Sequence, residues 1–486
     1  MASLVQMLRN LFIVLIGCPA RLHVPLHRQP ILLVLVALFL VAGGQATTAE
    51  DASSVDPAAV SFVRDVAPVL AHRCVSCHGD RKAESNYQLD TFESLQTPGD
   101  FELNPVTAGD VDDSEILRLI MSEDPDERMP RGSEPLSEKD IALIRRWIEQ
   151  GAVFDGERPD QPLSELVPRP THPAPPEVYP VIMPITSLIF HPTQNELIAS
   201  GHHELTVWDV ETGQLLRRIT GCAERTHALA LSPDGSTLAV AGGSPAQQGE
   251  VRLIHLGDGT ELKWFGPFKG VIFDVAFSHD GTQLAVAGED RTIRVFDVAS
   301  GTEIRSIENH SDWATAVAWS PDDKLIVSGS RDRTAKVFEL ESGQLQTSYS
   351  GHENPVFGVA FHPDGKQILS AGGDSKIHVW NVEDGKKTAE IAGYSGNVYK
   401  LILLDGQVFS SSADKSARQH QLDNREQKHV FGDHTDWVFS LAVDTAKQRL
   451  ATGCYDGQVR IWNLTDGSAT LSFTAVPGTS APPVKH

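Results

Sequence analysis

Apolar positions recur with two different periods along this chain. Between residues 58 and 157 they follow the spacing of helices, and beyond residue 183 they form short runs separated by turns, as strands do. We therefore expect a multidomain protein, in which a small all-α domain precedes an all-β domain. The stretch between them, residues 158–182, is rich in proline and indicates an extended linker.

Three main helices are predicted in the first domain. Residues 60–75 form one helix, and a second begins at the capping residue Asp113 and buries its apolar face, including Met121. The third, Glu138–Gln150, follows the capping residue Ser137. Its apolar stripe consists of Ile141, Ile144, Trp147 and Ile148.

The second domain is built from repeats. Each repeat ends in a β-run with a characteristic dipeptide, and successive dipeptides lie 46, 42, 42, 42, 40 and 42 residues apart. A period near 42 residues with several short strands per repeat predicts a seven-bladed β-propeller. The dipeptides are Trp208-Asp209, Ile254-His255, Phe296-Asp297, Phe338-Glu339, Trp380-Asn381, His420-Gln421 and Trp462-Asn463.

The N-terminal 49 residues have the pattern of an export segment. Arg28 precedes a twelve-residue apolar run, Ile31–Ala42, which is short for a membrane span and is followed by small residues. We expect a cleaved signal peptide and an exported protein, in the periplasm or at the outer face of the cytoplasmic membrane. An uncleaved N-terminal anchor, which would be the chain's one membrane contact, and a lipoprotein modified at Cys18 are the alternatives.

Charge divides the chain in the same places. Of its 486 residues, those from 51 to 167 carry 25 Asp and Glu against 11 Lys and Arg, and the whole chain has a net charge of −23. Such a chain does not bind nucleic acid unaided. Five cysteines are too few for a disulfide scaffold.

The acidic domain contains the motif Cys74-Val75-Ser76-Cys77-His78. This spacing is that of covalent c-type haem attachment, because two thiols one turn apart can each form a thioether and the next imidazole can bind the iron. We expect one haem c, held by Cys74 and Cys77, with His78 as the proximal ligand. A redox-active dithiol and half of a zinc site are the weaker alternatives.

Met129 is the expected distal ligand of the iron. Pro130 disfavours a helical conformation at Met129, so its thioether lies on an extended loop that can reach the far haem face. An open coordination position or a histidine is the alternative.

Two families resemble these regions. Residues 58–157 are similar to the planctomycete-type cytochrome c domain, through the haem motif with Gly79, Leu89-Asp90, Met129-Pro130 and Trp147-Ile148. This resemblance implies a cytochrome c fold that binds haem through Cys74, Cys77, His78 and Met129. Residues 183–476 resemble WD40 repeats, and residues 477–486 form a tail.

The WD40 resemblance implies a buried hydrogen-bond chain in each blade, formed by a histidine, a Ser or Thr, a turn aspartate and a tryptophan. Blade four has Phe338 in place of the tryptophan. We interpret these residues as structural, and no catalytic or metal motif is evident in the propeller. The complete sets are His352, Ser370, Asp374 and Trp380 in blade five, and His434, Thr452, Asp456 and Trp462 in blade seven.

These features favour an exported electron-transfer protein whose propeller docks a partner protein. A haem-dependent oxidoreductase with a substrate site on the propeller, and a haem-containing scaffold, are the alternatives, so enzymatic activity is left open. Trp313 and Trp437 are the expected partner-binding residues, because each follows its blade histidine by three positions, and Trp264 and Phe268 would extend the same rim. The acidic haem domain predicts a redox partner with a basic docking patch.

Overall fold

The computed structural model describes residues 59–79, 83–100, 103–131, 135–166, 169–244, 248–478 and 484–485. The expected export segment and Cys18 lie outside the described residues. Among the helices that are described, none combines the length and the apolar character that crossing a membrane requires.

The helical region packs its elements around one apolar core. Phe62 and Trp147 lie at its centre with ring centroids 5.2 Å apart, and both side chains are almost completely buried. The elements are η1 (Phe62–Val66, a π-helical turn), α2 (Ala67–Arg73), α3 (Val75–His78), η2 (Glu84–Asn86), α4 (Phe92–Leu95), α5 (Glu115–Met121), α6 (Glu138–Glu149) and α7 (Leu163–Leu166).

Two of the three predicted helices differ in detail from the expectation. The segment 60–75 is divided into η1 and α2, with the Ser61 side chain capping η1 and a proline in the first turn of α2. Helix α5 begins after Ser114 rather than Asp113. The cap of α6 is confirmed, since the Ser137 hydroxyl accepts the backbone N–H of Asp140.

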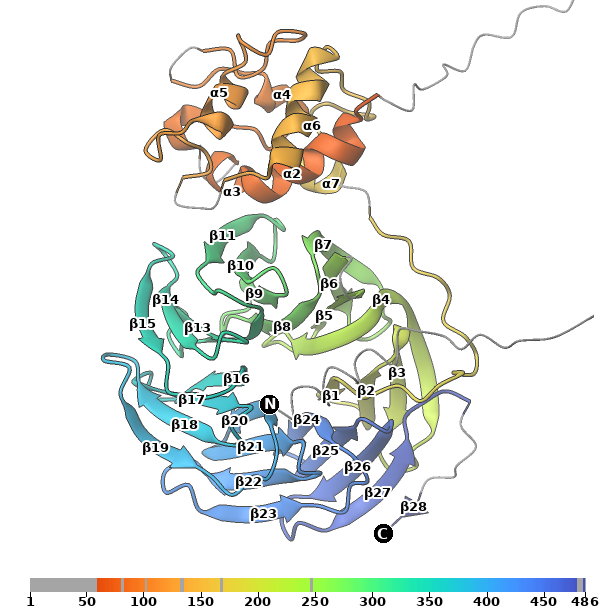
Figure 1. The fold of residues 1–486 in the computed structure, drawn as a ribbon. Coiled ribbons are helices and arrows are strands. Elements are labelled where there is room, and N and C mark those ends of the chain that lie inside the picture. The colour runs from red at the N-terminus through yellow and green to blue at the C-terminus, as the bar shows by residue number, and fades with distance from the viewer. Residues whose placement is uncertain are drawn as a thin grey trace, which may run out of the picture. The chain divides into compact units, whose positions relative to one another are not determined.

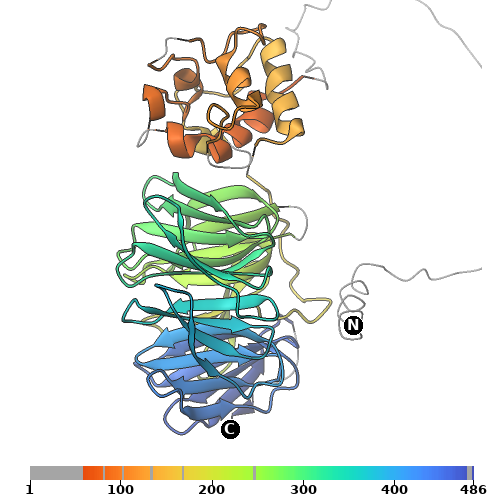
Figure 2. The same ribbon diagram turned by 60° about the vertical axis from the view of Figure 1, so that its left-hand side comes forward.

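The β region is the part of the chain that contains strands β1 to β28. Its described residues form six sheets, whose strands make seven antiparallel four-stranded units, here called units one to seven (Figure 1). The long strand β4 belongs to two units, because its first half pairs with β3 and its second half pairs with β5. A view turned by 60° shows the same succession of sheets (Figure 2). This arrangement is consistent with a WD40 propeller.

The strands of the first four units have the following bounds. Unit one contains β1 (Leu188–Phe190), β2 (Glu196–Ser200), β3 (His202–Asp209) and the start of β4 (Leu215–Leu231), and unit two contains the rest of β4, β5 (Thr237–Ser244), β6 (Gln248–His255) and β7 (Glu261–Lys269). Unit three contains β8 (Ile272–Phe277), β9 (Gln283–Gly288), β10 (Thr292–Asp297) and β11 (Glu303–Glu308). Unit four contains β12 (Ala314–Trp319), β13 (Leu325–Ser330), β14 (Ala335–Glu339) and β15 (Leu345–Tyr349).

Units five to seven follow the same order. Unit five contains β16 (Val356–Phe361), β17 (Gln367–Gly372), β18 (Ile377–Asn381) and β19 (Lys387–Ile391). Unit six contains β20 (Val398–Leu404), β21 (Gln407–Ser412), β22 (Ala417–Gln421) and β23 (Gln427–Phe431). Unit seven contains β24 (Val438–Asp444), β25 (Arg449–Cys454), β26 (Gln458–Asn463) and β27 (Ala469–Thr474), and the short strand β28 (Val484–Lys485) pairs with β27.

Apolar contacts between neighbouring units join them into a ring. Each buried cluster of the β region draws side chains from two successive units; Trp380 of unit five, for example, shares a cluster with Val337 of unit four. The last cluster connects unit seven to unit one, where Phe473 packs with Trp208. Chain segments also cross this junction, since Ile185 donates its N–H to the Cys454 carbonyl and accepts the Ser440 hydroxyl.

The expected hydrogen-bond chain is present in unit five. The Trp380 indole N–H lies 3.1 Å from the Ser370 hydroxyl, which lies 2.8 Å from Nε2 of His352. Nδ1 of His352 lies 2.8 Å from the Asp374 carboxylate. In unit four the same contacts join His310 to Ser328 and Asp332.

Unit seven departs from this pattern at one position. His434 and Trp462 both contact the Thr452 hydroxyl, as expected. Nδ1 of His434, however, lies 3.0 Å from the thiol sulfur of Cys454. The turn residue Asp456 instead accepts the hydroxyl of Thr435. A neighbouring thiol has therefore replaced the turn carboxylate as the partner of this imidazole.

We predict that Trp380→Phe lowers the free energy of unfolding by about 1–2 kcal/mol, because the buried Ser370 oxygen loses its indole donor. Trp462→Phe should have a similar effect, since its indole makes the same bond to Thr452. Urea denaturation followed by far-ultraviolet circular dichroism measures both values. Phe338→Leu in unit four is the control for lost aromatic packing; an equal loss there would contradict the hydrogen-bond explanation.

Candidate functional site

The two thiols of the haem-type motif lie at the junction of α2 and α3. Cys74 ends α2 and begins α3, and its carbonyl accepts the N–H groups of Cys77 and His78 at 3.1 and 3.0 Å. Both cysteines are free, and each residue as a whole is partly buried. The two sulfur-bearing residues and the imidazole thus belong to one helical turn.

A backbone contact orients the His78 imidazole. Its Nδ1 lies 3.1 Å from the Tyr87 carbonyl oxygen, so the N–H at this position donates to that oxygen and Nε2 keeps its lone pair. The Leu89 N–H donates to the His78 carbonyl at 2.8 Å, which fixes the backbone of the same residue. A hydrogen bond to the second ring nitrogen is the usual way in which a metal-binding histidine is held.

Gly79 is needed where the chain leaves α3. A Cβ atom at this position would lie 2.7 Å from the Val75 carbonyl oxygen, closer than a real side chain can approach. The glycine therefore allows the tight exit that brings the segment around Tyr87 back beneath His78.

Met129 and Cys74 both pack against the core of the helical region, and both are partly buried. The Met129 N–H donates to the Leu119 carbonyl at 3.1 Å, which ties its loop to helix α5. This backbone bond fixes the main chain of Met129, while its side chain packs against the core.

The expectation that Met121 lies in the core is wrong. Its side chain is 45% exposed, and its sulfur accepts a guanidinium N–H of Arg145 at 3.0 Å. It borders an open hollow of about 450 Å³ between α5 and α6, with Ile120 and Ile141 among its walls. Neither the two thiols nor His78 line this hollow, so it is separate from the motif.

The residues present fit a covalently attached haem better than the two alternatives. Two free thiols one turn apart could each form a thioether with the haem, and an imidazole whose Nδ1 is hydrogen-bonded could bind the iron through Nε2. Burial raises the pKa of the Cys74 thiol to about 12, whereas a redox-active dithiol requires a lowered thiol pKa. The adjacent residues Cys77 and His78 are poor co-ligands for a tetrahedral zinc ion.

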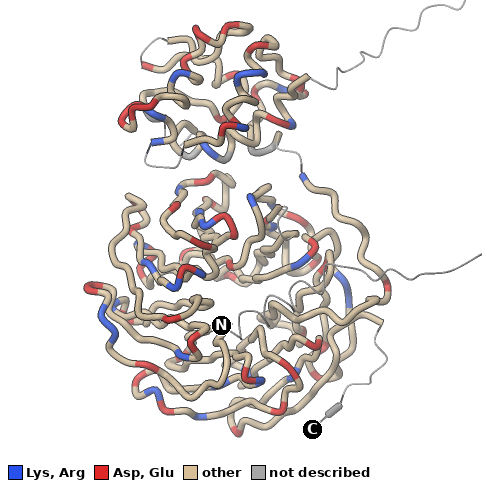
Figure 3. Tube along the Cα trace, in the orientation of Figure 1, with Lys and Arg blue, Asp and Glu red and all other residues tan. Residues whose placement is uncertain are grey.

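The loop before Met129 is acidic and exposed (Figure 3). Glu127 pairs with Arg118 at 3.0 Å, and Arg131 donates to the Asp126 carbonyl. Glu123 and Asp124 are also exposed, so the loop presents several carboxylates beside one paired glutamate.

The structure places Trp313 and Trp437 at equivalent positions, each directly before the first strand of its unit. Trp437 is 41% exposed, whereas Trp313 is half-buried and stacks on Phe273 at 5.3 Å. Trp264 and Phe268 do not extend this rim, because both are buried against neighbouring strands. The indole N–H of Trp264 donates instead to the buried Glu250 carboxylate.

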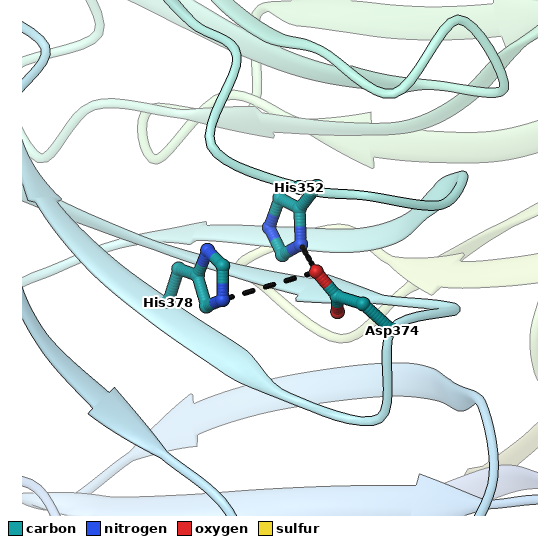
Figure 4. A group of neighbouring side chains, drawn as sticks. All are labelled: His352, Asp374 and His378. Atoms are coloured by element: carbon teal, nitrogen blue, oxygen red, sulfur yellow. Dashed lines mark hydrogen bonds and ion pairs between the residues drawn. The ribbon is translucent and has the colours of Figure 1, made fainter.

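Unit five brings together three potential metal ligands, His352, Asp374 and His378 (Figure 4). The repeat pattern predicted His352 and Asp374 as neighbours, but nothing in the sequence pointed to His378. The two imidazole rings are stacked 4.1 Å apart and nearly parallel, at 7°. An imidazole binds a metal ion through a lone pair in the plane of the ring. Two stacked parallel rings cannot direct these lone pairs at one ion, so this group is not a metal site.

His378 occupies a place that basic side chains take in other units. Arg294 in unit three and Arg418 in unit six pair with Asp290 and Asp414, the aspartates four residues earlier, at 2.6 and 2.7 Å. Nε2 of His378 lies 3.8 Å from Asp374, its equivalent aspartate. Burial and the adjacent His352 lower the pKa of His378 to about 4, so this position is neutral at pH 7.

Comparisons with known proteins agree with this division of the chain. A family model for planctomycete cytochrome C matches residues 74–132, and one for the WD domain, G-beta repeat, matches residues 260–297, 301–339, 343–381 and 425–463. Coronin-7 of Pongo abelii and Coronin-7 of Homo sapiens are each 34% identical to this chain over 110 residues. That stretch is 22% of this chain and 12% of each coronin. The chain therefore joins a planctomycete-type cytochrome c region to WD40 repeats.

We predict an acid-sensitive stability that depends on His378. Between pH 6.5 and 4 the unfolded chain binds a proton at His378 while the folded chain does not, so the free energy of unfolding falls as the pH falls. Between pH 7 and 5 this group alone accounts for about 2 kcal/mol. Urea denaturation at the two pH values measures the difference.

The matched variant is His378→Arg, which copies units three and six. Because an arginine is charged at both pH values, its loss of stability between pH 7 and 5 should be smaller than that of the natural chain. An unchanged loss in this variant would show that His378 does not cause the acid sensitivity.

Proposed function

We propose that this chain is an exported c-type cytochrome that binds one haem c covalently and transfers electrons. In this proposal the helical region has a cytochrome c fold. The units of the β region form a closed seven-bladed WD40 propeller that docks a protein partner. When bound, the haem supplies a one-electron redox centre.

One observation carries the haem assignment. The turn that contains Cys74, Cys77 and His78 is followed by a backbone carbonyl, that of Tyr87, which engages Nδ1 of His78. This contact favours the tautomer with a lone pair on Nε2, the atom that a proximal ligand uses. Cys74 and Cys77 would form the thioethers, and Met129 would be the distal ligand on its loop anchored to α5.

The covalent attachment can be tested directly. The full chain, produced in a host that matures c-type cytochromes, should keep its haem after denaturing electrophoresis. Cys74→Ala/Cys77→Ala should remove this covalent haem. Loss of haem from the natural chain under the same conditions would overturn the proposal.

We predict that Met129→Ala retains covalent haem, loses the sulfur-to-iron band of the oxidised protein and has a lower reduction potential, because methionine ligation raises the potential. Visible spectroscopy and redox titration measure these changes. Met121→Ala is the matched control, since Met121 is exposed on α5 and contacts Arg145. An unchanged spectrum in Met129→Ala, or the same change in Met121→Ala, would contradict the assignment of Met129.

The acidic loop supports a redox partner with a basic docking patch. We predict that the acidic loop attracts a cationic cobalt complex and so speeds its oxidation of the reduced protein. Rising salt should slow this reaction, because it screens the attraction. Oxidation by hexacyanoferrate, an anion, should instead become faster with salt. Stopped-flow kinetics measures both rates.

The variant Glu123→Gln/Asp124→Asn/Asp126→Asn should weaken both salt dependences, because it removes three exposed carboxylates beside Met129. Glu341→Gln/Glu353→Gln, which removes exposed carboxylates of the β region, is the control. Equal effects of the two variants would mean that overall charge, and not the loop, guides the probe.

A further inference from the structure

Units four and seven contain the same local arrangement at the same end of the β region. The residue before each tryptophan is an aspartate, Asp312 or Asp436, whose carboxylate accepts the backbone N–H of that tryptophan at 2.8 Å in both units. Each tryptophan carbonyl accepts an N–H at 2.9 Å from the residue that follows the second strand of its unit. The two sites therefore have the same backbone frame and can be compared atom by atom.

The residue that follows the second strand differs between the two units. In unit four it is Arg331, whose guanidinium lies over the Trp313 ring, 4.4 Å from its centroid. Nε of Arg331 also lies 3.4 Å from the Asp312 carboxylate. In unit four, Arg331 thus makes a cation–π contact with the indole of Trp313 and pairs with the Asp312 carboxylate.

In unit seven the equivalent residue is Tyr455. Its ring meets the Trp437 ring edge-on, with centroids 6.0 Å apart and planes at 62°, and it brings no positive charge. Trp437 is 41% exposed and Tyr455 is 45% exposed. The unit keeps the aspartate and the indole but presents them to the solvent.

Neighbouring rings hold the indole in place. Tyr399 and Phe439 have ring centroids 6.5 and 6.2 Å from that of Trp437. Phe439 also contacts Tyr455 at 5.9 Å. An indole fixed by three rings needs little reorganisation to receive a ligand, which lowers the entropic cost of binding.

The charges around Trp437 favour a cation. Asp436 is partly exposed and Asp433 is exposed on the same loop. The ammonium group of Lys415 reaches the same loop, where it donates to the Thr435 carbonyl. A planar guanidinium can stack on an indole and pair with a carboxylate at the same time, which an ammonium group does less well.

We propose that Trp437 and Asp436 form a receptor for an arginine side chain of a partner protein. The partner supplies in trans the group that Arg331 supplies to Trp313 and Asp312 within unit four. This inference rests on the proposed docking function of the β region and names the chemistry of the partner. It is independent of the haem.

The test follows each indole separately in the full chain. The protein is labelled with 5-fluorotryptophan, and Trp437→Phe and Trp313→Phe assign two of the fluorine resonances. The probes are the blocked peptide Gly-Gly-Arg-Gly-Gly and its citrulline analogue, which has a similar shape without the charge. The Trp437 resonance should shift saturably with the arginine peptide, and the citrulline peptide should bind at least about tenfold more weakly.

Two substitutions exchange the properties of the units. Tyr455→Arg places the arginine of unit four in unit seven and should abolish the shift of Trp437. Arg331→Ala uncovers Trp313 and should create a peptide-dependent shift of the Trp313 resonance. Asp436→Asn should weaken binding at Trp437 with little effect on the fold, because the oxygen of the asparagine side chain can still accept the backbone N–H of Trp437.

Several results would overturn the inference. They are an unmoved Trp437 resonance, equal binding of the citrulline or the corresponding lysine peptide, or binding that survives in Tyr455→Arg. A shift of Trp437 on concentrating the protein without peptide would assign the site to a second copy of this chain. None of these results affects the haem attachment or the Met129 spectrum, so failure here is distinct from failure of the proposed cytochrome function.

Discussion

No unit of the β region can bury its apolar residues alone, and this constraint decides the rest of its structure. Every buried cluster there lies between two successive units, and the cluster that contains Trp208 and Phe473 connects the last unit to the first. A four-stranded sheet has two faces, and each face needs a neighbour. A ring is the arrangement that gives every sheet a neighbour on both faces, and it places the loops of all units at two common ends.

The units of the ring share one backbone arrangement, but equivalent positions in different units carry different side chains. Position 378 is a histidine where other units have an arginine paired with an aspartate. Cys454 contacts His434 where unit five has a carboxylate. Because neighbouring strands hold the frame, such exchanges alter local charge and exposure without altering the fold, and the open indole of Trp437 is one result.

The helical region depends on a different principle, a small apolar core with the turn of Cys74, Cys77 and His78 at its edge. Phe62 and Trp147 are buried at the centre, while Cys74 at the junction of α2 and α3, and Cys77 and His78 on α3, are only partly buried. Tyr87 connects His78 to the rest of the helical region. Its carbonyl contacts Nδ1 of His78, and its hydroxyl donates to the Leu95 carbonyl. The imidazole is therefore oriented by a segment that is itself anchored on both sides.

Sequence alone determined the features that depend on short spacings and on the repeat. The spacing of Cys74, Cys77 and His78 and the Ser137 cap follow from such patterns. The contacts of His352 with Ser370 and Asp374 are those that the resemblance of the repeats to WD40 blades implies. A helical turn, a capping bond and a repeated unit each impose a fixed distance along the chain, so a linear pattern can reveal them.

Contacts between distant segments were decided by the tertiary structure. Met121 is exposed although it continues an apolar pattern, and Trp264 is buried although it was expected at a rim. Arg331 covers Trp313, whereas Tyr455 leaves Trp437 open. Exposure depends on what the fold places against a side chain. That neighbour comes from another strand or unit, so the residue's own sequence surroundings do not specify it.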